Sequence, residues 1–184
     1  MKKIYLFNLI LFTTFVSCQN KQENTLKAEL GTLNVEFTET LLSSKADSID
    51  LTDILRLTQK EYDDLQLSKV KGLEGYGLSD LTMGQVLLNN ANGTMLTVQI
   101  ITDGEITEYL LSYDKNGDLV DNLIVAYEDM VEYYSEISSK ISSDLITVQT
   151  VNFTYGDEDG NQTEVSDTAI TKYQITPEFK FVMN

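Results

Sequence analysis

The chain has 184 residues and carries 29 acidic against 13 basic side chains, which gives a formal net charge of −16 at pH 7. It contains no histidine and one cysteine, so catalytic pairs of serine or cysteine with histidine are excluded, and zinc or copper sites lack their usual ligands. The acidic balance also excludes nucleic acid as an expected partner, because phosphate binding depends on clustered Lys and Arg.

The first 17 residues have the features of a secretory signal. Lys2 and Lys3 form a short positive head, and residues 4–15 form an apolar run interrupted at only three polar positions. A signal peptide has an apolar segment of roughly 7–15 residues, whereas a membrane-spanning helix needs about 20. The pattern therefore predicts a cleaved signal peptide over residues 1–17.

The end of this run, Phe15-Val16-Ser17-Cys18, resembles the lipobox of bacterial lipoproteins, in which a small residue precedes a lipid-carrying cysteine. The resemblance implies that Cys18 receives a diacylglycerol, that cleavage occurs before it, and that the new amino group is acylated. Stable anchoring takes at least two acyl chains, and that family supplies two or three. We therefore expect Cys18 to anchor the protein to a membrane, and not to act as a disulfide partner, nucleophile or metal ligand.

The residues after the cysteine bear on the location of the protein. Proteobacterial lipoproteins retained in the inner membrane tend to carry Asp where this chain has Gln19, so the resemblance favours the outer membrane, on either its periplasmic or its surface side. Residues 18–28 are predicted to be the lipidated cysteine and a flexible tether. Cleavage would leave 167 residues with 11 basic and 29 acidic side chains, a charge of −18. That length suits one domain over residues 29–184.

The N-terminal part of this domain predicts few regular elements. Apolar and polar residues alternate over residues 33–37, which indicates a first short strand. Thr58 and Glu61 form a capping-box pattern, with Leu57 and Tyr62 as the accompanying apolar pair, so a short helix is predicted over about 59–66. Residues 71–80 contain three glycines but lack the spacing of a phosphate-binding loop, so we expect an ordinary loop.

From about residue 81 onward the sequence predicts an antiparallel meander. Alternating apolar and polar residues recur in four runs, at residues 83–88, 96–100, 109–113 and 123–127. The turns between them contain Asn92-Gly93, Asp103-Gly104 and Asn116-Gly117. These dipeptides tolerate the positive φ angles of tight hairpins. A further hairpin is predicted from residues 146–155 and 165–175, and Phe179 and Phe181 close the chain.

The sequence thus predicts a mainly β, single-domain fold on a largely antiparallel sheet with one or two short helices. One sheet face should be mostly buried; it carries Leu96, Val98, Leu111, Val125, Phe153 and Tyr173. Residues 127–141 are ambiguous, because their apolar residues recur at helical spacing while their serines are poor helix formers. We predict a short helix over about 129–137 that runs into a strand.

Two acidic segments invite a metal-binding interpretation. Residues 114–118, Asp-Lys-Asn-Gly-Asp, begin like a calcium-binding EF-hand loop, but Leu119 stands where that loop needs glycine and Val125 where it needs a bidentate glutamate. Asp157, Glu158 and Asp159 form the second segment. Short hairpin turns explain both segments, so no metal site, cofactor or catalytic residue is predicted.

The expected function is that of a lipid-anchored cell-envelope protein that acts as a non-enzymatic binding or interaction module for a protein, peptide or glycan. Residues 110–123, LLSYDKNGDLVDNL, resemble a Tyr-Asp-x-x-Gly-x-Leu-x-Asp hairpin of small Bacteroidetes envelope lipoproteins, which implies no particular activity. The alternative is a carboxylate-dependent glycan hydrolase, which requires two facing carboxyl groups at roughly 5–10 Å. A buried pair of facing carboxylates in a cleft would favour the hydrolase, and a broad, apolar exposed sheet face or groove would favour the binding module.

Overall fold

The computed structural model describes residues 33–43, 54–129, 135–155 and 162–184. Its strands form one antiparallel sheet in the order β2-β3-β4-β5-β6-β7-β8-β9, and β1 pairs with β6. The strands are β1 (Thr40–Ser43), β2 (Leu81–Asn90), β3 (Gly93–Ile101), β4 (Glu105–Asp114), β5 (Leu119–Asp129), β6 (Ser135–Ile141), β7 (Leu145–Tyr155), β8 (Gln162–Ile175) and β9 (Phe181–Met183). The predicted β-rich, antiparallel fold is confirmed.

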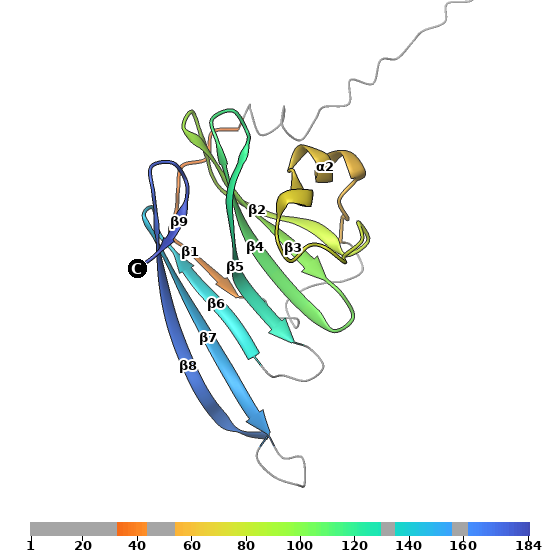
Figure 1. The fold of residues 1–184 in the computed structure, drawn as a ribbon, viewed down its shortest axis with the longest axis vertical. Coiled ribbons are helices and arrows are strands. Elements are labelled where there is room, and N and C mark those ends of the chain that lie inside the picture. Colours follow the sequence, from red (N-terminus) through yellow and green to blue (C-terminus); the bar gives the residue numbers. More distant parts are fainter. Residues whose placement is uncertain (1–32, 44–53, 130–134, 156–161) are drawn as a thin grey trace, which may run out of the picture.

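The four runs of alternating residues form β2 to β5, and the predicted hairpin after residue 145 forms β7 and β8. Figure 1 shows that this last hairpin extends beyond the other strands. The first predicted strand is wrong, because over residues 33–37 only Val35 makes a single bridge, to Asn89. The first strand is instead β1, whose four residues pair with β6 about 100 positions later in the chain.

The helix predicted over about 129–137 is also wrong where the chain is described. Asp129 ends β5, and Ser135 to Ile137 belong to β6. Ile137 and Ile141 are four residues apart, a spacing that fits both a helix and every second position of a strand. In β6 the two isoleucines lie on one face of the strand, and Ser138 and Lys140 lie on the other.

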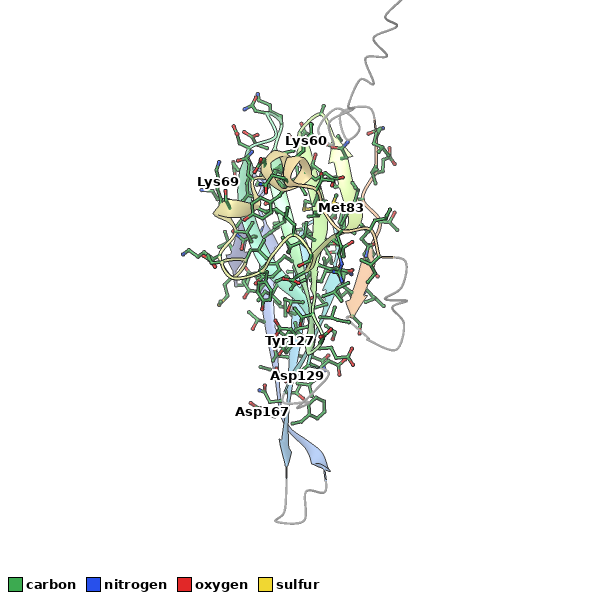
Figure 2. All side chains as sticks on the ribbon, turned by 90° about the vertical axis from the view of Figure 1, so that its right-hand side faces the viewer. Lys60, Lys69, Met83, Tyr127, Asp129 and Asp167 are labelled. Carbon is green, nitrogen blue, oxygen red and sulfur yellow. The ribbon has the colours of Figure 1, made fainter. Side chains whose placement is uncertain are left out.

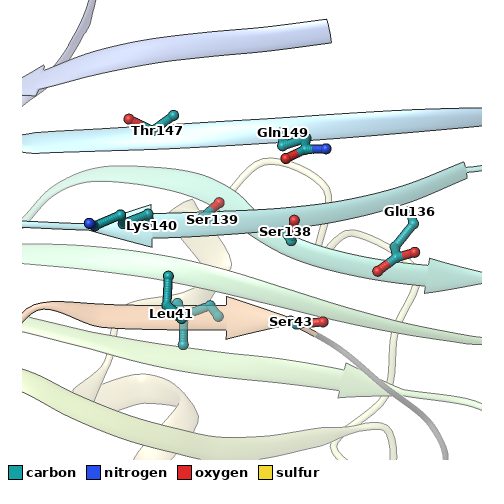
Figure 3. Close-up of a pocket in the computed structure, with 9 residues that line it drawn as sticks. Leu41, Ser43, Glu136, Ser138, Ser139, Lys140, Thr147 and Gln149 are labelled. Atoms are coloured by element: carbon teal, nitrogen blue, oxygen red, sulfur yellow. The ribbon is translucent and has the colours of Figure 1, made fainter. Parts of the chain in front are cut away.

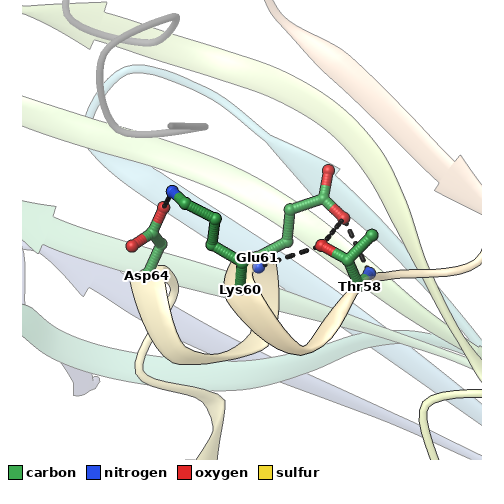
Figure 4. Close-up of polar contacts among 4 residues, drawn as sticks. All are labelled: Thr58, Lys60, Glu61 and Asp64. Atoms are coloured by element: carbon green, nitrogen blue, oxygen red, sulfur yellow. Dashed lines mark hydrogen bonds and ion pairs between the residues drawn. The ribbon is translucent and has the colours of Figure 1, made fainter. Parts of the chain in front are cut away.

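The predicted capping box forms as expected and starts helix α2 (Gln59–Asp64). The Thr58 hydroxyl accepts a hydrogen bond from the Glu61 backbone N–H at 3.3 Å, and the Glu61 carboxylate accepts one from the Thr58 N–H at 2.7 Å. Lys60 and Asp64 add an ion pair one turn apart, at 3.3 Å (Figure 4). The helix is therefore fixed at its first turn by its own side chains.

Helix α2 ends two residues before the predicted boundary because Gln66 adopts a left-handed conformation, with φ 54°. A 3₁₀ turn, η2 (Leu67–Lys69), follows it. The Gln66 side chain donates a hydrogen bond of 2.8 Å to the Gly117 carbonyl in the β4–β5 turn. This contact holds the helical segment against the sheet. In the described part of the chain no helix is long and apolar enough to cross a membrane.

Two apolar clusters lie on opposite sides of β3 and β4. The first packs Leu96, Val98 and Leu111 against the helical segment and the loop that follows it. The second joins residues of β2 to β5 with residues of β6 and β7, and it includes Val125. The prediction of one buried sheet face is therefore only partly right: β4 is buried on both faces, while Phe153 and Tyr173 are half-buried.

The turn between β8 and β9 brings the C-terminal end of the sheet back to its middle. Phe179 in this turn is buried, and its backbone carbonyl accepts a hydrogen bond of 2.7 Å from the Ser112 hydroxyl of β4. A Cβ atom on Gly93, at the start of β3, would lie only 2.8 Å from the Phe179 ring. The sheet therefore curls, and its two halves enclose the second cluster.

Candidate functional site

Cys18, the one site residue that the sequence predicts, lies outside the described residues, as do the signal peptide over 1–17 and the tether over 18–28. The lipid anchor therefore stays a prediction.

The acidic turn over residues 114–118 is a β-hairpin turn, as predicted. The Asp114 carboxylate accepts backbone hydrogen bonds from Asp118 at 2.9 Å and from Asn116 at 2.8 Å. These donors, led by Asp118, lower the pKa of Asp114 because they stabilise its ionised form. The Asp114 carboxylate therefore stabilises the turn by accepting hydrogen bonds from the turn's own backbone. The second acidic segment, Asp157 to Asp159, lies outside the described residues.

A recess of about 450 Å³ lies on the side of β1, β6 and β7 that faces away from the second cluster. Figure 3 shows its lining residues: Leu41, Leu42, Ser43, Glu136, Ser138, Ser139, Lys140, Thr147 and Gln149. Within each strand the alternate residues point the other way into the core, for example Ile141 and Ile146. The recess therefore lies over a packed core, and apart from Leu42 and Ser139 its lining residues direct their side chains away from that core.

The recess is nearly neutral in charge, although the chain as a whole carries −16. Of its lining residues only Glu136 and Lys140 are charged. The Lys140 ammonium forms an ion pair of 3.0 Å with Glu39, and because both side chains are more than half exposed this pair adds little stability. Hydroxyl and amide groups supply most of the remaining polar surface. Such a lining suits a ligand that is recognised by hydrogen bonds.

Beneath the recess, on the face of β6 that packs against the second cluster, lies a buried polar atom that has no partner among the described residues. Ser139 is 5% exposed, and its hydroxyl makes no hydrogen bond to any described residue. Across the sheet it lies between Leu42 and Val148, which are both buried. A buried hydroxyl in this position destabilises the fold, so the serine is not explained by packing.

A second group of polar side chains lies at the open end of the β4–β5 hairpin, where β4 begins and β5 ends, away from the acidic turn. The Tyr76 hydroxyl donates a short hydrogen bond to Glu105, which raises the pKa of Tyr76 to about 12. Burial raises the pKa of Tyr127, and the charges of Asp129 and Glu105 raise it further. Figure 2 shows Tyr127 and Asp129 near this end of the sheet.

Two pairs of described carboxylates lie directly opposite each other on neighbouring strands: Glu105 with Asp129 on β4 and β5, and Glu128 with Glu136 on β5 and β6. Of these four residues only Glu136 lines the recess. No group of three or more acidic, histidine or cysteine side chains that could hold a metal ion occurs within the described residues.

Sequence reasoning missed the recess entirely. Its lining comes from β1, β6 and β7. Strands β1 and β6 pair through Leu41 and Lys140, and no local pattern predicts a pairing over that distance. Within residues 135–141 isoleucine occurs only at positions 137 and 141, with Ser139 at the alternate position between them, so the local pattern does not by itself predict the strand β6. No protein-family model matches the chain, and comparisons with curated proteins and with solved structures likewise give no match.

Proposed function

We propose that the protein is a lipid-anchored binding module of the bacterial cell envelope. It is attached to the membrane through Cys18 and binds its ligand in the recess on β1, β6 and β7. The ligand is a polar segment of glycan, peptide or protein. The observation that carries the proposal is the recess itself, a nearly neutral, hydroxyl- and amide-lined hollow on a chain of charge −16. Binding sites combine a concave surface with a few placed polar groups.

The recess supports binding over the hydrolase alternative. Glycoside hydrolysis uses two carboxyl groups on either side of the scissile bond, and the lining contains only Glu136. The recess differs from the broadly apolar surface that we expected for a binding module, because its lining residues other than Leu41 and Leu42 are polar or charged. A polar surface favours a ligand bound through hydrogen bonds.

The anchor is tested by replacing Cys18 with serine and feeding cells a fatty-acid probe. Loss of label and release from the membrane fraction are the expected results, since the thiol is the expected site of lipidation. If the variant is labelled and membrane-bound like the wild type, the anchor is elsewhere.

Binding is tested by capture from detergent-solubilised envelopes with three forms of the protein: wild type, Gln149→Arg and Gln174→Arg. Both glutamines are exposed, but only Gln149 lines the recess. We expect a ligand captured by wild type and by Gln174→Arg to be lost with Gln149→Arg. Equal capture by all three forms would mean that the recess is not the binding site.

A further inference from the structure

The two ends of the recess differ in chemistry. At one end Lys140 of β6 pairs with Leu41 of β1. In the middle Ser138 pairs with Gln149 of β7, and Glu136 lies at the other end, as Figure 3 shows. Residues two apart on a strand point to the same side and lie about 6.6 Å apart. The two ends of the recess are therefore separated by about 13 Å.

The Glu136 end of the recess favours a positive group. The Glu136 carboxylate has no ion-pair partner among the described residues, and Glu128 of β5, directly opposite, brings a second carboxylate close to it. At the other end the charge of Lys140 is balanced by Glu39, at 3.0 Å. The two ends are farther apart than the Debye length of about 8 Å at physiological ionic strength, so Lys140 opposes a cation at Glu136 only weakly.

The opposite end of the recess favours an apolar group. The Leu41 side chain is 76% exposed, so an apolar side chain that covers it removes apolar surface of both partners from water. An anionic group at this end would compete with Glu39 for Lys140 and would approach a chain of charge −16. Leu41 is therefore the better contact here.

The middle of the recess suits the backbone of an extended peptide. The hydroxyl and amide side chains of Ser43, Ser138 and Gln149 can both donate and accept hydrogen bonds, and an extended peptide has N–H and C=O groups to offer them. Its side chains repeat at the same spacing as those of β6, so residues four apart reach the two ends. The lining contains no aromatic side chain on which a sugar ring could stack, which favours a peptide over a glycan.

We propose that the recess binds an extended peptide segment of a protein in which a lysine or arginine and an apolar residue stand four positions apart. The cationic side chain pairs with Glu136, the apolar side chain packs on Leu41, and the hydroxyl and amide groups between them bind the peptide backbone. This inference rests on the proposed binding function and specifies its ligand.

The test is calorimetric titration of the full chain, purified in detergent, with the capped peptide Leu-Thr-Thr-Thr-Lys-Thr-Thr-Thr-Leu, which has the required spacing in both chain directions. Because partly exposed ion pairs contribute modestly, Glu136→Gln should weaken binding about threefold to fivefold. Glu178→Gln removes the same charge at an exposed position outside the recess and should leave binding unchanged. A peptide with glutamine in place of its lysine should bind wild type and Glu136→Gln equally.

The apolar contact has its own matched pair of variants. Leu41→Ser should weaken binding about fivefold, because the leucine of the peptide then loses its apolar contact. Leu55→Ser changes a leucine that is 86% exposed and lies outside the recess, and it should have no effect. Circular dichroism of each variant should match the wild type.

The inference is overturned if the peptide does not bind, if Glu136→Gln acts no more strongly than Glu178→Gln, or if Leu41→Ser acts no more strongly than Leu55→Ser. Capture from envelopes distinguishes this failure from that of the proposed function. A captured ligand that depends on Gln149 but is a glycan overturns only the choice of a peptide. Capture that does not depend on Gln149 overturns the recess as the binding site, and the inference with it.

Discussion

Two buried serines of the sheet should respond in opposite ways to replacement by alanine. Ser139 lies beneath the recess, on the core face of β6, and its hydroxyl has no partner among the described residues. Ser112 on β4 is equally buried, but its hydroxyl donates to the Phe179 carbonyl at 2.7 Å. The two positions therefore differ mainly in hydrogen bonding.

The size of each effect follows from the state of the hydroxyl. A buried polar group without a partner costs about 1–3 kcal/mol, so Ser139→Ala should raise the free energy of unfolding by about 1 kcal/mol. Ser112→Ala removes the hydrogen bond to the Phe179 carbonyl, and this loss should lower the free energy of unfolding by about 1–2 kcal/mol. For a chain of this size 1 kcal/mol corresponds to about 2–4 °C in Tm.

Urea unfolding of the mature chain, followed by circular dichroism, measures both variants against the wild type. The expected result is a higher midpoint for Ser139→Ala, a lower one for Ser112→Ala, and an unchanged slope. If Ser139→Ala destabilises the protein as much as Ser112→Ala does, the Ser139 hydroxyl has a partner that stabilises the fold, and the reasoning about this buried hydroxyl is refuted.

Three further predictions concern the helix cap, the alkaline pH range and metal ions. Thr58→Ala should lower the free energy of unfolding by about 1 kcal/mol, because it removes the acceptor for the Glu61 N–H; the exposed neighbour change Gln59→Ala is the control, and equal effects in urea unfolding would contradict the cap. The pKa of Tyr76 rises from an ordinary value of 10 to about 12 in the folded protein, chiefly through its hydrogen bond to Glu105. The stabilisation is therefore complete below pH 10 and is lost as the pH rises toward 12, where the unfolded chain ionises first. Tyr76→Phe should flatten this decline, and an unchanged pH profile would mean that the hydrogen bond does not persist in solution. At matched ionic strength, millimolar calcium should shift the Tm no more than magnesium does, because the acidic side chains of a short turn diverge; a calcium-specific shift of many degrees would reveal a site that this account lacks.

The sequence predicted those parts of the fold that depend on neighbouring residues. Asn116-Gly117 marks a hairpin turn because its backbone requirement, the positive φ of Gly117, is local, and the Thr58–Glu61 cap is complete within four residues. The turn at Asn92-Gly93 also forms, but without the expected positive φ. The buried and exposed positions of β3 could be predicted only in part. Alternation identifies the strand, but the second buried face exists because distant segments cover it.

The recess could not be predicted, because its geometry arises from pairing between distant strands. Leu41 comes to lie beside Lys140 through the pairing of β1 with β6, and neither local sequence indicates its partner. The error over residues 129–137 has a related origin. Ile137 and Ile141 satisfy a helical period, and only the pairing of β6 with β7 selects the strand.

The central claim is that the recess on β1, β6 and β7 contacts a ligand in the cell envelope. A photo-cross-linking amino acid placed at Gln149 in the anchored, full-length protein tests it directly in living cells. The same probe at Lys180, which is exposed and lies outside the recess, is the matched control. The account predicts a discrete cross-linked product from position 149 that is missing from position 180. Identical products from the two positions, or none from position 149, would contradict it.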